Sequence, residues 1–209
     1  MPTFKKALAA HMAALGRPVF TARDLAAVSG RSPSVVSQGL AFLGRQGLAV
    51  KVTHGVWAAG GVMPSPYAVI PYILPKQRAY VSFTSALHLH GIIEQIPQVV
   101  TLASVAHTKE VRTGAGTFAV HHLAPSFFCG FVRREGGGFF IAEPEKALVD
   151  CLYVSAFRDR RFSHFPELDF SGTFSFKKAA AWAARIKSGA ARKHALKRLA
   201  EIKTGAARK

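Results

Sequence analysis

The chain has 209 residues, of which 49% are hydrophobic, and its formal net charge is +17. A chain of this length and apolar content buries a substantial core, which excludes a disordered tail protein and leaves room for two small domains. The large positive charge favours a polyanionic partner.

The positive charge is concentrated at both ends of the chain. Residues 1–60 carry a net charge of +6, residues 61–170 carry +1, and residues 171–209 carry +10. Two cationic segments around a nearly neutral scaffold suit a nucleic acid, the usual polyanion inside a cell. A basic surface that is merely solvated is the alternative.

The two cysteines, Cys129 and Cys151, have neither metal-ligand spacing nor the density of a disulfide framework. No secretory signal precedes the first predicted helix, and no apolar run approaches the roughly 20 residues that cross a bilayer. We therefore expect a cytoplasmic protein that binds no metal, cofactor or membrane.

The N-terminal segment predicts two helices in quick succession. Apolar residues recur at helical spacing at Phe4, Leu8, Met12 and Leu15. Gly16 and Pro18 end this helix. Thr21 and Asp24 then form a capping pair typical of a helix start, and Gly30 ends a short second helix.

A third helix follows after only a few residues. Ser32 is a typical N-cap, Pro33 favours the first helical position, and the helix ends near Gly47. Its apolar stripe consists of Val36, Leu40 and Leu43. Two helices joined by a tight glycine-containing turn are typical of a helix-turn-helix, whose second helix enters the major groove.

Polar side chains on the exposed side of this third helix are candidates for reading DNA. Ser34, Ser37 and Gln38 are able to hydrogen-bond to base edges. The flanking candidates for the DNA backbone are Arg31, the capping Ser32 and Arg45. An ordinary solvated helix face remains the alternative.

Residues 48–52 and 56–58 predict a strand pair around a turn at Thr53–Gly55. The passage LGRQGLAVKVTHGVWA resembles the helix-to-wing passage of winged-helix regulators, in which the hairpin touches the DNA backbone or minor groove. Lys51 and His54 are the candidates here, although a lone histidine in a turn is also commonly just exposed.

The fold expected overall is α+β, with four consecutive parts. These are a winged helix-turn-helix over residues 1–60, a Pro/Gly-rich linker with repeatedly interrupted regular structure over 61–76, a mixed α/β domain over 77–170 and a basic helical arm over 171–209.

The middle domain predicts a sheet with flanking helices. Strands are expected at 99–105, 117–123, 127–134 and 139–141. Ser82 is expected to cap a helix that ends at Gly91, with His90 facing inward in a structural role. A further helix begins after Glu143, with Pro144 first, and buries Ala147, Leu148, Cys151 and Leu152.

Four segments of the middle domain occur in the same order as in a known family: YVSFTSALHLHGIIEQIP, VRTGAGTFAVHHL, FFCGF and IAEPEKALVDCLY. In these segments the chain resembles the AbiEi family of type IV antitoxins, over residues 80–155. Glu143 stands where that family often has threonine, a weaker cap.

The resemblance implies an antitoxin linked to abortive phage infection that also represses its own operon by binding inverted repeats in double-stranded DNA. It further implies a nucleotidyltransferase toxin encoded alongside, counteracted without a stable complex. The alternative is a stand-alone winged-helix regulator whose second domain binds an effector or a protein.

Two enzymatic interpretations fail on spacing, so we expect no catalytic residues. The cluster Glu143, Glu145, Lys146 and Asp150 contains the residue types of a metal-dependent nuclease. Lys146 and Asp150 instead have the spacing of an ordinary helical ion pair. Ser82 or Ser85 with His88 has no nucleophile elbow.

In the C-terminal arm, Ala191, Ala195, Leu199 and Ile202 form a stripe that leaves out Arg192, Lys193, Lys197 and Arg198. These four cations are candidates for phosphate contacts. An anionic membrane surface and a solvated helix are the alternatives. We expect truncation at Gly172 to leave the rest of the chain folded.

Overall fold

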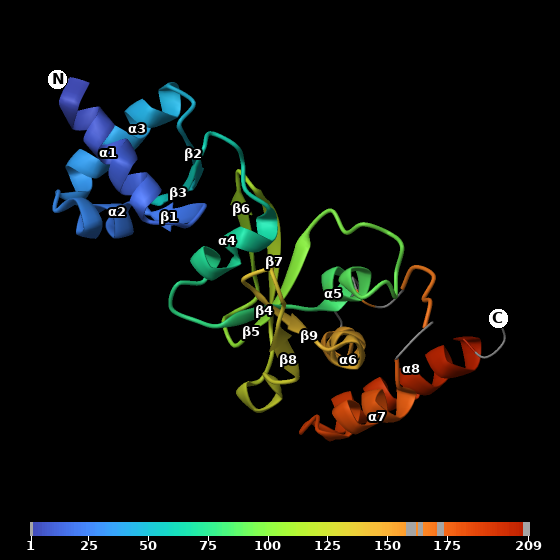
Figure 1. Cartoon of the computed structure of the whole chain (residues 1–209). Coiled ribbons are helices and arrows are strands. Elements are labelled where there is room, and N and C mark those ends of the chain that lie inside the picture. Colours follow the sequence, from blue (N-terminus) through green and yellow to red (C-terminus); the bar gives the residue numbers. More distant parts are fainter. Residues whose placement is uncertain (1, 158–161, 163–164, 171–173, 207–209) are drawn as a thin grey trace. The chain divides into compact units, whose positions relative to one another are not determined.

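The computed structural model describes residues 2–157, 162, 165–170 and 174–206 of the chain. The described residues form a mixed α+β fold with eight α-helices and two β-sheets (Figure 1). They divide into two compact units. Unit 1 takes in the chain up to Ile73 together with Arg112–Gly116, and unit 2 takes in Leu74–Val111 and the residues from Thr117 on.

The described part of unit 1 contains four helices and a three-stranded antiparallel sheet. Its elements are α1 (Pro2–Ala14), β1 (Val19–Thr21), α2 (Ala22–Ser29), α3 (Pro33–Arg45), β2 (Ala49–Thr53), β3 (Val56–Ala59) and α4 (Pro66–Ile73). The strand order β1-β3-β2 places β3 in the centre. The strand β1 was not predicted from the sequence, because three residues are too few to show an alternating pattern.

The helix starts in unit 1 follow the predicted capping signals. The Asp24 amide donates to the Thr21 hydroxyl at 3.0 Å, and the Thr21 amide donates to the Asp24 carboxylate at 2.8 Å. Gly30 ends α2 with φ of 65°, a left-handed conformation that glycine adopts readily. The Val35 amide donates to the Ser32 hydroxyl at 3.4 Å. Both predicted caps are therefore confirmed.

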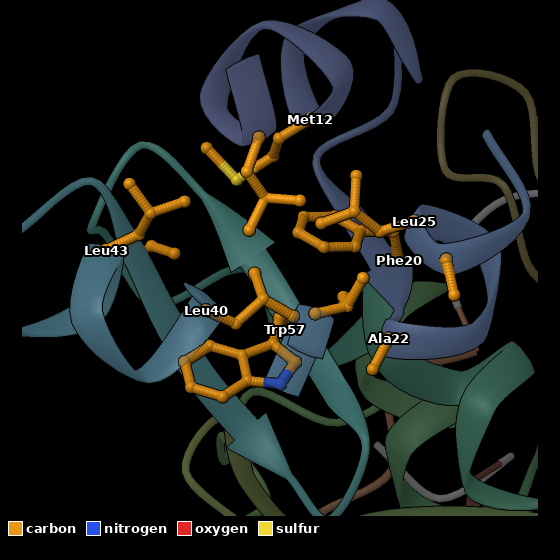
Figure 2. Close-up of a cluster of buried hydrophobic side chains, with 11 residues drawn as sticks. Met12, Phe20, Ala22, Leu25, Leu40, Leu43 and Trp57 are labelled. Carbon is orange, nitrogen blue, oxygen red and sulfur yellow. The ribbon is translucent and has the colours of Figure 1, made fainter. Parts of the chain in front are cut away.

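One hydrophobic cluster joins the first three helices of unit 1 to its sheet, with side chains from each pointing into the same interior (Figure 2). Its buried members are Leu8, Met12, Phe20, Ala22, Leu25, Ala26, Val36, Leu40, Leu43, Ala49 and Trp57. Because α3 contributes Val36, Leu40 and Leu43 to this cluster, the cluster also determines which face of α3 stays exposed.

The segment 61–76, expected to be a linker in which regular structure is repeatedly interrupted, contains the helix α4 over Pro66–Ile73. Pro66 is the first residue of the helix, where its missing amide hydrogen is no loss. Pro71 lies inside the helix. The helix nevertheless forms, and its buried side chains are Val69, Ile70 and Ile73. Burial of these side chains outweighs the helix-breaking effect of proline.

Unit 2 is built on a six-stranded mixed sheet in the order β6-β7-β5-β4-β9-β8. The elements up to the last strand are β4 (Ala79–Val81), α5 (Phe83–Leu89), β5 (Val100–Ser104), β6 (Lys109–Thr113), β7 (Gly116–His122), a short 3-10 helix (Pro125–Phe127), β8 (Phe131–Arg133) and β9 (Phe140–Ala142). The helices α6 (Pro144–Ser155), α7 (Phe176–Ala184) and α8 (Gly189–Ala206) follow. The end of β6 and the start of β7 are counted with unit 1.

The helix α6 lies in the interior of unit 2, with every residue from Glu145 to Leu152 buried. Both α7 and α8 pack against α6 and against each other (Figure 1). The two C-terminal helices and the turn between them contribute Ala179, Ala183, Ile186, Ala191, Ala195 and Leu199 to the buried interior. The segment expected to be a separable arm thus packs as part of unit 2, in which α7 and α8 cover α6.

Candidate nucleic-acid interface

The exposed face of α3 carries the side chains that the sequence analysis selected for reading bases. Ser34, Ser37 and Gln38 are all exposed. Val35 and Ala41 are exposed as well, Val35 to 37%. These two were not predicted to read bases, because their side chains form no hydrogen bonds.

Polar and cationic side chains flank this face of α3. Arg45 is exposed at the last turn, with its guanidinium carbon 6.0 Å from the centroid of the Phe42 ring. Arg31 precedes the helix and is half-buried, and Ser32 is exposed while its hydroxyl caps α3. Arg17 lies 3.5 Å from Asp24, so the charge of Arg17 is balanced within unit 1.

The β2–β3 hairpin presents the other two candidates of unit 1. Lys51 on β2 and His54 in the turn are both exposed. The turn is completed by Gly55, with φ of 71°. The strand pairing shifts register between Lys51 and Thr53. The Val52 carbonyl on β2 accepts a hydrogen bond from the Gly114 amide at 2.8 Å, which anchors β2 within unit 1.

The C-terminal candidates lie on α8 in unit 2. Arg192, Lys193 and Lys197 are exposed, whereas Arg198 is half-buried and pairs with Glu201 at 2.9 Å. The exposed basic face of α8 is thus narrower than the sequence alone indicates. Among the described residues, no helix is long and apolar enough to cross a membrane.

A second group of polar side chains meets inside unit 2. Lys146 and Asp150 of α6 form an ion pair, and the Lys146 ammonium also donates to the Tyr80 hydroxyl at 3.2 Å. The other Asp150 oxygen accepts from the Ser82 hydroxyl at 2.7 Å and from the Tyr80 hydroxyl at 3.0 Å. The ammonium lies 4.0 Å from the centroid of the Phe127 ring. This polar network therefore connects α6 to β4 and to Ser82.

The burial of this network changes how its ion pair is interpreted. The predicted pairing of Lys146 with Asp150 is confirmed, but both side chains are fully buried, whereas an ordinary helical pair lies at the surface. Burial raises the pKa of Asp150, although Lys146, Ser82 and Tyr80 oppose this effect. Burial and the charge of Asp150 likewise raise the pKa of Tyr80 and of the Cys151 thiol.

The serines near this network are occupied by structural hydrogen bonds. Ser82 donates to Asp150, so its expected role as the cap of α5 is not observed. Ser85 accepts from the Thr101 amide at 2.9 Å, and a ring nitrogen of His88 lies 3.2 Å from a backbone carbonyl. His90 lies 2.8 Å from the Ala142 carbonyl, which confirms its hydrogen-bonded role.

The first residue of α5 has an unusual backbone conformation. Phe83 has φ of 56°, in the left-handed region that bulky residues rarely occupy. Its fully buried ring packs against His121 at 4.7 Å and Phe162 at 5.0 Å between centroids. This aromatic packing offsets the backbone strain.

The carboxylates at the start of α6 attach α7 to the interior. The Lys178 ammonium lies 3.2 Å from Glu143 and 3.3 Å from Glu145. The Ser175 amide donates to Glu145 at 3.1 Å. Partial burial lowers the pKa of Lys178, but the two carboxylates raise it overall. The cluster that invited comparison with nucleases thus holds helices together.

Comparison of the chain with models of protein families found no match, and comparison with curated proteins found none either.

Proposed function

We propose that the protein is a DNA-binding transcriptional autorepressor whose unit 1 is a winged helix-turn-helix. One observation carries this proposal: the element order α1-β1-α2-α3-β2-β3, combined with the sheet order β1-β3-β2 and a polar exposed face on α3. In such a domain the second helix of the pair enters the major groove and the hairpin contacts the backbone.

The proposal gives each exposed group on unit 1 a role. Ser34, Ser37 and Gln38 on α3 contact base edges, because their side chains donate and accept hydrogen bonds. The cations around α3 and on the hairpin, Arg31, Arg45, Lys51 and His54, contact phosphates together with Ser32. Contacts of the second kind fix position and supply affinity without reading sequence.

The basic face of α8 adds electrostatic affinity from unit 2. Arg192, Lys193 and Lys197 are exposed in two successive turns of α8. Each cation that neutralises a phosphate releases bound counterions from the DNA. Arg198 contributes less, because Glu201 balances its charge.

We further propose that the protein is an antitoxin of the AbiEi type, which counteracts a nucleotidyltransferase toxin encoded alongside without binding it stably. The support is the ordered set of motifs over residues 80–153. The last of these motifs supplies Lys146 and Asp150 to the buried network, so this motif builds the interior of unit 2.

A stand-alone regulator controlled by a small effector is the second candidate function. A pocket of about 380 Å³ in unit 2 favours it, since this volume lies within the range of small-molecule sites. Its polar lining includes Thr84, Gln98, Thr101, Glu110 and His121. Relief of growth arrest when the chain is co-expressed with a neighbouring toxin gene distinguishes the antitoxin from this alternative.

Footprinting on the region upstream of the protein's own gene tests the repressor. We expect protection of inverted repeats at nanomolar protein concentrations. Gln38→Ala should weaken binding to the protected sequence more than to other sequences, whereas Lys51→Ala should weaken both alike. Absence of any protection upstream of the gene would refute autorepression.

A further inference from the structure

The exposed face of α3 has a restricted chemical composition. From Pro33 to Gly44 the helix contains no lysine, arginine, histidine, aspartate or glutamate. The side chains it exposes before Arg45 are Pro33, Ser34, Val35, Ser37, Gln38 and Ala41. A helix of this kind meets the bases with one amide, two hydroxyls and apolar groups.

Each base pair selects particular side chains in the major groove. Guanine is read by arginine or lysine and cytosine by aspartate or glutamate, whereas adenine is read by glutamine or asparagine. The thymine methyl group is read by apolar contact. Serine hydroxyls can hydrogen-bond to several bases and therefore discriminate little between base pairs. Among the discriminating groups on this face, Gln38 suits adenine, and Val35 and Ala41 suit thymine.

The helical spacing groups these side chains. Ser34, Gln38, Ala41 and Arg45 follow one another at intervals of four, three and four residues, which places them on one stripe along α3. Side chains three positions apart on a helix are separated by about 5–6 Å. Gln38 and Ala41 are therefore close enough to meet neighbouring base pairs, which are spaced about 3.4 Å apart.

We propose that α3 recognises A·T base pairs: the Gln38 amide bonds to N6 and N7 of an adenine, and Ala41 and Val35 contact thymine methyl groups. This inference rests on the proposed function, because it requires α3 to enter the major groove. Double-stranded DNA is the occupant favoured by charge, since residues 1–60 carry a net +6 and Arg45 and Lys51 flank the face.

The test begins with the full-length protein and a library of random duplexes. After selection, we expect enriched half-sites in which the base pairs sensitive to Gln38→Ala are A·T. Gln46→Ala is the matched control, because Gln46 is also exposed but lies at the C-cap of α3. The enriched sequence should be unchanged in this control.

Single-atom changes in the selected duplex then locate the contacts. Replacing the critical adenine by 7-deazaadenine removes N7 and should weaken wild-type binding by about 5-fold or more, but should not weaken Gln38→Ala further. At the thymine that faces Ala41, replacement by uracil removes the methyl group and should weaken binding by the wild type but not by Ala41→Ser.

The possible failures are distinguishable. Enrichment of G·C pairs at the positions sensitive to Gln38→Ala overturns the inference and leaves DNA binding intact. The inference is also overturned if 7-deazaadenine weakens binding equally in wild type and Gln38→Ala. Tight binding without enrichment of any sequence overturns it as well. Absence of DNA binding overturns the proposed function together with this inference.

Discussion

The Lys146–Asp150 pair shows how burial alters the energetics of a common motif. A surface pair at this helical spacing contributes about 0.3–0.5 kcal/mol. In the interior of unit 2, both charges have lost their water, and Tyr80, Ser82 and the Phe127 ring replace part of it. Removing one partner therefore leaves an uncompensated buried charge.

We predict that Lys146→Met lowers the free energy of unfolding of unit 2 by about 3–5 kcal/mol. The double variant Lys146→Met/Asp150→Leu should recover part of this loss, because no buried charge remains. Recovery is incomplete, since the hydroxyls of Tyr80 and Ser82 lose their acceptor. Urea titrations followed by Trp182 fluorescence, in a Trp57→Phe background, measure both effects. A double variant less stable than Lys146→Met would contradict this account.

The capping box of α2 predicts a local dependence on pH. Burial raises the pKa of Asp24, but hydrogen bonds with Thr21 and the charge of Arg17 bring it below its usual value. A carboxylate with a lowered pKa in the folded state stabilises the fold above pH ~4, and this contribution disappears as the pH falls through the folded pKa.

Asp24→Ala should therefore destabilise unit 1 by about 0.5–1 kcal/mol near pH 7, and the difference from wild type should shrink below pH ~4. Fluorescence of Trp57 in a Trp182→Phe background follows unit 1. Thr21→Ser keeps the hydroxyl that caps the helix and is the matched control. A difference from wild type that persists unchanged at pH 3 would exclude the ionised box as its source.

At the scale of elements, α7 and α8 have two separate roles on opposite faces. Their alanine-rich faces cover α6, whereas Arg192, Lys193 and Lys197 of α8 face outward. Ser155 of α6 and His194 of α8 add a polar contact of 3.0 Å between these helices. Deleting the helices and neutralising their charge are therefore different experiments.

We predict that truncation at Gly172 prevents unit 2 from folding cooperatively. Each large aliphatic side chain removed from the interior, such as Ile186 or Leu199, accounts for about 1.5–3 kcal/mol of burial. The triple variant Arg192→Gln/Lys193→Gln/Lys197→Gln keeps this interior and should melt like the wild type. Calorimetry compares the two. A normal melting transition in the truncated protein would show that α6 does not need this cover.

Local signals in the sequence were sufficient for some elements and not for others. The caps at Thr21 and Ser32 act within three residues, so the sequence predicted the starts of α2 and α3. The strand β1 depends on pairing with β3, whose residues lie about forty positions away, and was missed. Ser82 had the local signal of a cap, yet its hydroxyl bonds to Asp150, 68 positions away.

For the candidate interface, local periodicity predicted which side chains are exposed but not what the buried faces cover. The helical period placed Ser34, Ser37 and Gln38 outside the core without knowledge of the fold. The same period placed the cations of α8 outside its alanine stripe, but it did not indicate what that stripe covers. That the stripe covers α6 depends on packing between distant segments, which a single helical pattern does not contain.

At the scale of the whole molecule, the proposed function predicts that the basic residues of both units set how DNA binding depends on salt. Each phosphate contact adds about 0.9 to the magnitude of the logarithmic salt slope. The triple variant of α8 should therefore flatten the slope by up to about 3 while keeping the wild-type base preference. Binding titrations between about 50 and 200 mM salt measure the change in this slope. An unchanged slope would show that α8 makes no phosphate contacts.

The buried cysteine on α6 offers a way to measure the rate at which unit 2 opens. Cys151 on α6 is fully buried, and Cys129 is half-buried. A thiol reagent can modify Cys151 only during excursions that open the interior around α6, so its rate of reaction reports how often these excursions occur. In a Cys129→Ser background, the rate of thiol modification measures how often unit 2 opens around Cys151. Adding operator DNA to the same reaction reveals whether occupancy of one unit slows the fluctuations of the other.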